Sequence, residues 1–296
     1  MRILICGGTG FLGQALAKRL LQDGHELVIH TRHPERHRSR GRLQAEWVAD
    51  FEQIAAPVQA IVNLTGANLF TLPWTRRRKN DIWTSRIDTT NRLVAWIEAQ
   101  TQKPEVLLNG SAVGFYGDRE DTLLTEVSEP GSGWSTEMVM AWENAAIGAE
   151  KAGIRTVLLR TGPVLGEGGM LQPLQLAFKF GLGGSMGDGQ FWFSWIHQAD
   201  WVEAVRFLIR TPTLQGPVNL TSPNPVRYRD FALTLGQTLR RPVWLTPPGW
   251  ALKPLLGERA ELIMSSTRAM PQQLADAGFE WRYPDIGSAL KAVCRR

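Results

Sequence analysis

The chain has 296 residues, a length that suits one large α/β domain or a domain with a smaller lobe. Its apolar content of 43% allows a sizeable core, and no stretch is long and apolar enough to cross a bilayer. The net charge of +5 permits an anionic ligand without indicating nucleic acid, and the two cysteines have neither metal-type nor redox-type spacing. We therefore expect a cytoplasmic protein with no metal site, no nucleic-acid partner and no membrane contact. The motifs described next add the expectation of a small-molecule substrate.

The chain begins with MRILICGGTGFLG, which predicts a strand that runs into a tight glycine turn. Arg2–Cys6 is a short apolar run, and an amphipathic helix is expected over Phe11–Gln22. The glycines between them form the pattern G-x-x-G-x-x-G. Gly7 can take backbone angles that a side chain forbids, Gly10 admits a pyrophosphate close to the main chain, and Gly13 lets the helix lie against the sheet.

This glycine turn is a candidate dinucleotide site. The first N–H groups of a helix can receive phosphate oxygens, and here they belong to Phe11 and Leu12. The hydroxyl of Thr9 adds one more donor. The alternative is a glycine turn that binds nothing, but its place between a strand and an amphipathic helix favours the binding site.

The second predicted strand, Glu26–Thr31, bears on the choice of dinucleotide. In an NAD site, the end of this strand normally carries Asp or Glu, which holds the ribose 2′-hydroxyl. Here Arg32 occupies that place and no acid is present. Because a guanidinium suits a 2′-phosphate, the sequence favours NADP(H) over NAD(H). The arginines after it are expected to be a solvated basic loop, which is also the alternative for Arg32.

Two further strands are expected over Gln44–Val48 and Val58–Asn63. The second ends in N-L-T-G, and Asn63 there can either hold the cofactor or tie the central sheet together. The next segment, Leu72–Arg86, mixes aromatic and basic residues. Such a mixture can bind nucleic acid, but one helix with an apolar face toward the sheet explains the pattern more simply. The apolar residues of that face are Ile82, Ile87, Leu93, Val94 and Ile97.

The strand expected over Glu105–Ser111 leads into S-A-V-G-F-Y-G. A hydroxyl at this strand end is well placed over a nicotinamide ring or a substrate carbonyl, and the alternative is a tight turn capped by Ser111. A helix over Trp134–Lys151, a strand over Ile154–Leu159 and a glycine-rich loop over Arg160–Gly168 come next. Alternating strands and helices predict a parallel sheet covered on both faces.

After residue 168 the composition shifts toward Gly, Pro and Trp, which predicts a separate small lobe on the substrate side. His197 stands at the start of a helix that reaches about Arg210, and it is either a catalytic base or a structural residue beside Asp200. The remaining expected elements are the strands Val218–Thr221 and Val243–Thr246 and the helices Tyr228–Leu239, Trp250–Leu256 and Gly287–Val293.

Several pieces together resemble the extended short-chain dehydrogenase/reductase superfamily, which includes the NAD(P)-dependent epimerases and dehydratases. In superfamily order they are GGTGFLG at Gly7–Gly13, NLTG at Asn63–Gly66, SAVGFYG at Ser111–Gly117, LLRTGPVLG at Leu158–Gly166 and FSWIHQADWVEAV at Phe193–Val205. The tail, with GERAELIMSSTRAMP and GFEWRYPDIGSAL, is similar to the C-terminal extension of bacterial epimerase-family proteins of the YfcH type.

The resemblance implies an α/β Rossmann fold, a doubly wound parallel sheet with a smaller C-terminal α/β substrate lobe. Residues 1–168 would form the NADP-binding domain, to which parts of 195–222 return. Residues 169–296 would be mainly the lobe, including the extension 247–296. Members of the superfamily often dimerise through two helices of the Rossmann domain, so a homodimer is one expectation.

The resemblance also implies which residues of this chain form the cofactor site and the active site. Arg32 would read the NADP phosphate, and Ser111 would lie in the active-site region. The residues that would bind cofactor through the matching motifs are Gly7, Thr9, Gly10, Phe11, Leu12, Gly13, Asn63, Thr65, Gly66 and Arg160.

One departure from the superfamily concerns its Tyr-x-x-x-Lys pair, in which the tyrosine exchanges a proton with the substrate and the lysine lowers the pKa of the tyrosine. None of the three tyrosines, Tyr116, Tyr228 and Tyr283, is followed four residues later by lysine. The corresponding helix carries WSTEMVMAWENAA, and Glu143 there has the wrong charge to replace a lysine. Ser111 and Tyr116 are therefore the candidate catalytic hydroxyls.

Two functions stay open from the sequence. The first is an NADP(H)-binding oxidoreductase or epimerase that acts on a carbonyl or hydroxyl carbon, with a nucleotide sugar among the candidate substrates. The second is a regulatory or scaffold protein that binds NADPH without turnover.

Overall fold

The computed structural model describes residues 1–38, 43–69, 74–247, 257 and 264–294. A parallel sheet of seven strands lies at its centre, in the order β11-β7-β5-β4-β1-β2-β3. The strands are β1 (Arg2–Cys6), β2 (Glu26–His30), β3 (Glu46–Val48), β4 (Ala60–Asn63), β5 (Val106–Ala112), β7 (Arg155–Thr161) and β11 (Gly216–Leu220).

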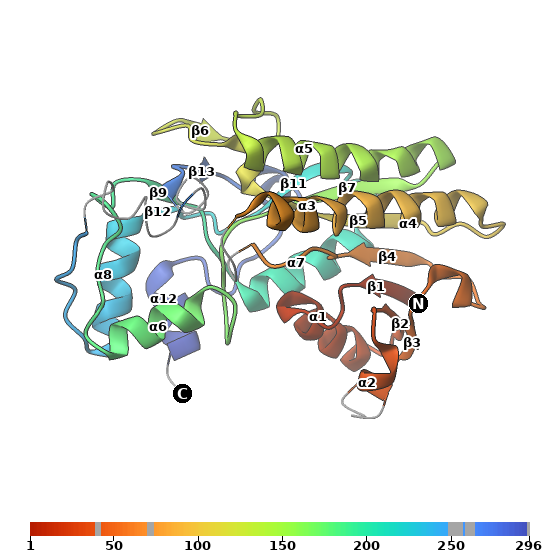
Figure 1. Ribbon diagram of the computed structural model, residues 1–296, viewed down its shortest axis with the longest axis horizontal. Helices are drawn as coiled ribbons and strands as arrows, with labels where there is room; N and C mark the ends of the chain where they lie inside the picture. The colour runs from red at the N-terminus through yellow and green to blue at the C-terminus, as the bar shows by residue number, and fades with distance from the viewer. Residues whose placement is uncertain (39–42, 70–73, 248–256, 258–263, 295–296) are drawn as a thin grey trace.

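Helices cover both faces of this sheet (Figure 1). One face carries α1 (Phe11–Gln22) and α7 (Gln198–Arg210), and the other carries α4 (Ile87–Ala99) and α5 (Trp134–Ile147). Because side chains alternate along a strand, Ile3 and Ile5 of β1 join the first core while Leu4 and Cys6 join the second. The doubly wound α/β sheet expected from the sequence is confirmed.

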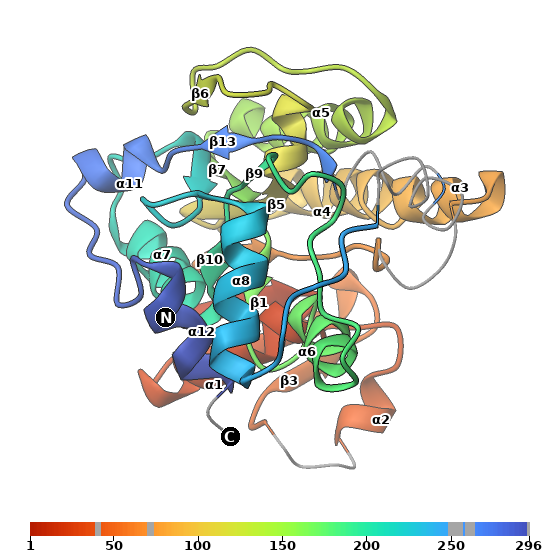
Figure 2. The same cartoon turned by 90° about the vertical axis from the view of Figure 1, so that its left-hand side faces the viewer.

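Short strand pairs and further helices lie outside the seven-stranded sheet, and some of them form a smaller lobe (Figure 2). The pairs are β6 (Leu123–Leu124) with β13 (Arg268–Ala269), β8 (Val164–Leu165) with β10 (Ile196–His197), and β9 (Trp192–Phe193) with β12 (Val226–Arg227). The helices are α6 (Leu171–Lys179), α8 (Tyr228–Leu239), α11 (Gln272–Asp276) and α12 (Ile286–Cys294). An aromatic core that includes Trp195, Tyr228 and Phe231 holds α6, α8 and α12 together.

The chain returns from this lobe to the sheet. Helix α7 packs on α1, and β11 pairs with β7 at the sheet edge, so residues 198–220 complete the central layers. Segments on either side of them lie in the lobe (Figure 1).

The structure corrects three local predictions. Val243–Thr246 is not a strand: only Leu245 makes an isolated bridge, to Gly184, because flanking prolines at 242 and 247 lack the N–H groups that a ladder needs. The helix expected over Trp134–Lys151 changes at Gly148 to a 3-10 turn, η3 (Gly148–Ala152). The segment Leu72–Arg86 does not form one continuous helix with residues 87–99. The helix expected over Trp250–Leu256 lies outside the described residues.

In place of that continuous helix the chain forms α3 (Arg76–Thr84), a break at Ser85 and Arg86, and then α4. Earlier in the chain, the short helix α2 (Pro34–Arg38) follows β2. The Thr75 hydroxyl caps α3 by accepting from the Arg78 N–H at 3.2 Å. The aromatic side chains of this segment pack internally, since Trp74 contacts Trp134 edge-on at 4.9 Å between ring centroids. Among the described residues, no helix has the length and apolar character to cross a membrane.

Candidate functional site

The glycine turn lies at the carboxyl edge of the sheet, where α/β folds of this kind bind ligands. Gly7 has φ +80°, and a Cβ there would come within 2.6 Å of the Leu64 carbonyl oxygen. A Cβ on Gly13 would come within 2.4 Å of the Gly7 carbonyl oxygen. Both positions therefore require glycine, and the turn is pressed against the loop after β4.

The N-terminus of α1 is open to an anion. Its N-cap is Gly10, no side chain caps it, and its first turn carries no acid. A Cβ on Gly10 would meet only the Gly7 carbonyl, at 3.4 Å, so the space beside Gly10 is available to a ligand. These features fit the diphosphate of a dinucleotide.

Arg32 is exposed at the end of β2, next to the strand that leads into the glycine turn. Within the described part of the chain it has no ion pair, so its guanidinium is available to a phosphate. The contact between Arg32 and a 2′-phosphate stays a prediction.

Asn63 is completely buried and ties the sheet together, which is the structural alternative of the two roles expected for it. Its Nδ2 donates to Thr90 Oγ1 at 2.9 Å and to Asn109 Oδ1 at 2.6 Å. Its Oδ1 accepts from the N–H and the hydroxyl of Thr65. Asn63 therefore shapes the loop that carries Thr65 and Gly66.

The loop over residues 166–169 packs on the ring of Phe11. Cβ atoms built on Gly166 and Gly169 would come within 2.8 and 3.1 Å of that ring. Gln198, the first residue of α7, donates to the Phe11 carbonyl at 3.3 Å. The Phe11 side chain thus joins the glycine turn to the part of the chain that leads into the lobe.

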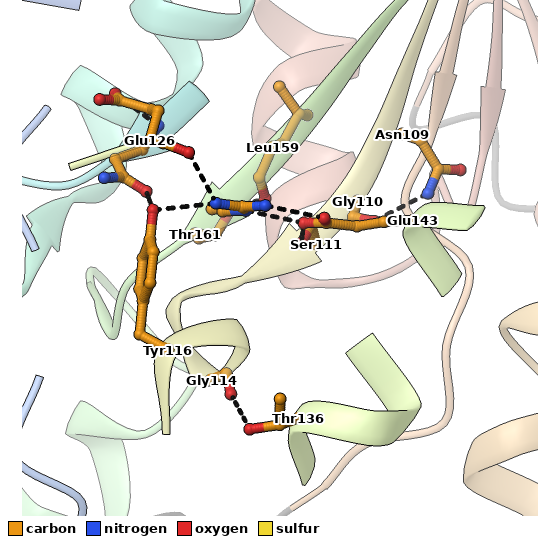
Figure 3. A network of polar contacts seen from close by, with 12 residues as sticks. Asn109, Gly110, Ser111, Gly114, Tyr116, Glu126, Thr136, Glu143, Leu159 and Thr161 are labelled. Carbon is orange, nitrogen blue, oxygen red and sulfur yellow. Dashed lines mark hydrogen bonds and ion pairs between the residues drawn. The ribbon is translucent and has the colours of Figure 1, made fainter. Parts of the chain in front are cut away.

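A buried polar cluster extends from the end of β5 (Figure 3). The Ser111 hydroxyl donates to Glu143 Oε1 at 2.5 Å. Arg160 donates to both oxygens of Glu143, at 2.9 and 3.0 Å, and through Nη1 to the Tyr116 hydroxyl at 3.1 Å. The Tyr116 hydroxyl in turn donates to Asn219 Oδ1 at 2.8 Å. All five side chains are buried.

The structure gives Arg160 an internal role where the sequence predicted a cofactor contact. All three guanidinium nitrogens are bonded to Glu143, Tyr116 and the Glu126 carbonyl. Burial lowers the pKa of Arg160, but the hydrogen bond and the charge of Glu143 outweigh burial, so the net pKa is raised. The buried charge of Arg160 is thus balanced by Glu143 rather than by a ligand.

Tyr116 also differs from its expected catalytic role. Its side chain is fully buried, and its hydroxyl is engaged by Asn219 and Arg160. Burial raises the pKa of Tyr116 above its usual range. A buried phenol with both partners inside the protein does not face a substrate, so Ser111 is the candidate hydroxyl that remains.

Helix α5 has the sequence WSTEMVMAWENAAI, which contains neither tyrosine nor lysine. The Trp142 ring lies against Gly110, where a Cβ would come within 2.6 Å of it, and its Nε1 donates to Thr90 Oγ1 at 3.1 Å. Glu143 comes next on the same buried side. The sequence did not reveal the role of Glu143, although an acid directly after Trp142 on the buried side of a helix is a signal that could have indicated it.

His197 is structural in this fold. Its Nδ1 accepts from the Ala199 N–H at 3.0 Å as the N-cap of α7, and its ring lies 4.0 Å from that of Tyr283. Burial, with the charge of Arg282, lowers the pKa of His197 to about 4. The Asp200 carboxylate accepts from the backbone N–H groups of Arg282 and Tyr283 and fixes the C-terminal segment.

Within the described ranges, no three His, Cys, Asp or Glu side chains gather where they could hold a metal ion.

Two family models match this chain. Residues 3–220 match the NAD dependent epimerase/dehydratase family, and residues 247–293 match a domain of unknown function, DUF1731.

Similar proteins cover almost the whole chain. The epimerase family protein YfhF of Bacillus subtilis is 35% identical over 99% of this chain and 98% of its own length. The chloroplastic epimerase family protein SDR39U1 homolog of Arabidopsis thaliana is 35% identical over 99% of this chain and 86% of its own. A crystal structure of human epimerase family protein SDR39U1 with NADPH has a TM-score of 0.90 and 27% identity, and covers 100% of both chains. The chain therefore belongs to the NAD dependent epimerase/dehydratase family.

Proposed function

We propose that this protein binds NADP(H) and transfers a hydride to or from a carbonyl or hydroxyl carbon of a small molecule, with a nucleotide sugar as one candidate class. The observation that supports the cofactor is the open glycine turn, with Arg32, which has no ion pair among the described residues, at the end of the neighbouring strand β2. The similar human structure holds NADPH, which supports the same choice.

In this proposal the chain positions the ligands and the cofactor supplies the redox chemistry. Gly10 admits the diphosphate to the N–H groups of α1, and Arg32 binds the 2′-phosphate. The bound NADP(H) gives or takes the hydride.

Ser111 handles the proton of the substrate oxygen. Its own proton is donated to Glu143 Oε1, so the Ser111 oxygen presents lone pairs. It is therefore set to accept a hydrogen bond from a substrate hydroxyl. As an alcohol is oxidised, its proton moves to Ser111 while the Ser111 proton moves to Glu143, and the reverse transfer accompanies reduction.

The cofactor claim is tested by fluorescence titration of wild type, Arg32→Ala and Arg92→Ala with NADPH and NADH. Arg92 is the matched control because it is an exposed arginine paired only with Asp50 at the surface. We expect Arg32→Ala to weaken NADPH by about tenfold or more, as for loss of a charge-assisted contact, with NADH unchanged. Failure of wild type to bind NADPH, or a preference for NADH, overturns the claim.

A second candidate is an NADPH-binding regulator or scaffold without turnover. The buried, fully engaged hydroxyl of Tyr116 favours it, because no Tyr-Lys pair serves the site. A spectrophotometric screen of NADPH oxidation with sugar nucleotides, aldehydes, ketones and quinones separates the two. Oxidation that Ser111→Ala abolishes excludes the regulator, and no oxidation with any class favours it.

A further inference from the structure

Arg86 occupies an unusual place between α3 and α4. Its side chain is 7% exposed, and a Cβ on Gly66 would come within 2.7 Å of its Cζ. The Nη1 group donates to the carbonyls of Ala67 at 3.1 Å and Ile82 at 3.2 Å, while the buried Nε has no partner. The guanidinium therefore has hydrogen-bonding capacity that the described residues do not use.

Among the described residues, Arg86 also lacks a counter-ion. Three arginines of the described chain are buried: Arg86, Arg160 and Arg206. Arg160 pairs with Glu143, and Arg206 pairs with Asp23 and Glu203. Arg86 has no carboxylate partner within the described residues. Burial, with the charge of Arg78, lowers the pKa of Arg86 to about 10, which still leaves it charged at neutral pH.

The position of Arg86 connects the two halves of the candidate site. Gly66, beside its guanidinium, belongs to the same loop as Leu64, against which Gly7 is pressed. On the other side the guanidinium carbon lies 5.2 Å from the centre of the Trp142 ring, and that ring covers Gly110 next to Ser111. Arg86 thus contacts both the loop that packs on the glycine turn and the Trp142 ring that packs on Gly110 beside Ser111.

We propose that Arg86 binds an anionic oxygen group, a phosphate or a carboxylate, of the ligand that lies across the carboxyl edge of the sheet. A buried cation is normally retained with a partner of opposite charge, and a guanidinium pairs well with both groups. Two backbone carbonyls alone do not require a positive charge, since a neutral amide can donate to them. The inference rests on the proposed function for the identity of the site. The anionic group is part either of the NADP(H) cofactor or of the small-molecule substrate.

The test uses the whole protein with Arg86→Gln, Arg86→Lys and the control Arg92→Gln, an exposed arginine on α4. The first arm measures NADPH affinity. If the anionic group belongs to the cofactor, Arg86→Gln weakens the affinity for NADPH by about tenfold or more. Arg86→Lys then recovers part of that affinity, and Arg92→Gln binds NADPH as wild type does.

The second arm measures the rise in melting temperature caused by inorganic phosphate at constant ionic strength, with and without saturating NADPH. If the anion is the substrate's, the NADPH affinity of Arg86→Gln is unchanged, but the stabilisation by phosphate seen with NADPH-loaded wild type is lost. Unchanged NADPH affinity and unchanged phosphate response in Arg86→Gln overturn the proposal and leave Arg86 a structural residue.

The experiment distinguishes failure of this inference from failure of the proposed function. If the proposed function is wrong, the wild-type protein does not bind NADPH. In that case the phosphate arm without NADPH still decides the role of Arg86. If Arg86→Gln does not fold, Arg86→Lys carries the test, because lysine keeps the charge and loses the planar fork of donors. Weakening of either ligand in Arg86→Lys then supports the proposal, and wild-type values for both overturn it.

Discussion

The Ser111 hydroxyl and the Glu143 carboxylate are joined by a 2.5 Å hydrogen bond in which Ser111 is the donor. The same carboxylate holds Arg160 through both of its oxygens. One acid therefore orients the candidate catalytic hydroxyl and neutralises a buried cation. Substitutions at Ser111 and Glu143 should separate these two tasks.

Ser111→Ala should abolish turnover with any substrate found for the protein and leave the NADPH dissociation constant within about threefold of wild type, since no phosphate contact is removed. Initial-rate measurements and fluorescence titration check the two parts. A variant that keeps the full kcat would show that another group handles the proton.

Glu143→Gln should destabilise the protein by about 3 kcal/mol, because it leaves the Arg160 charge buried without a partner. Urea denaturation measures the loss. Asp50→Asn is the matched control: it removes the acid of the exposed Arg92–Asp50 pair and should cost at most about 1 kcal/mol. Equal losses in the two variants would contradict the role given to Glu143.

Gly10→Ala should weaken NADPH by about tenfold or more and change the free energy of unfolding by less than about 1 kcal/mol. The added methyl group meets only the Gly7 carbonyl, at 3.4 Å, but occupies the space that the diphosphate needs. Gly148→Ala is the control, because its Cβ makes a 3.4 Å contact with Val94 away from the turn. Wild-type NADPH affinity in Gly10→Ala would place the diphosphate elsewhere.

His197 should make the protein less stable in mild acid. Its folded-state pKa is lowered by burial to about 4 from an ordinary value of 6.5. The unfolded chain therefore binds a proton first as the pH falls. The stabilisation is complete above about pH 6.5 and is lost toward pH 4, a difference of about 3 kcal/mol at most.

His197→Asn tests that pH dependence, since asparagine keeps an acceptor at the N-cap of α7 and does not titrate. The difference in unfolding free energy between pH 7 and about pH 4.5 should be smaller in this variant than in wild type. Equal pH dependence in the two proteins would show that other groups cause the acid sensitivity.

Local patterns were sufficient for much of the fold. The helices Phe11–Gln22 and Tyr228–Leu239 have the predicted bounds, because their apolar faces and their ends are specified by neighbouring residues. The glycine turn could also be predicted from the sequence, because the backbone conformation that requires glycine is determined within a few residues. The break between α3 and α4 at Arg86 could not be predicted, because no glycine or proline lies there.

The candidate site was less predictable because its contacts join distant parts of the chain. Tyr116 meets Asn219, 103 residues away, and no local pattern at either residue indicates the other. The same holds for β6 and β13, two-residue strands that pair Leu123 with Arg268 although these residues are far apart in the chain. The position of Arg160 within a superfamily motif led to the prediction that it binds the cofactor. The structure shows that Arg160 pairs with Glu143 inside the protein.

The pairing of β11 with β7 has a consequence for how the protein is made. A nascent polypeptide that has emerged only as far as residue 168 presents an uncovered strand edge at β7, with backbone groups ready to join another molecule. That edge is closed only after residue 220 has been synthesised. The central sheet therefore depends on chain segments from both sides of residue 168, and a polypeptide cut at that point lacks the strand that covers β7.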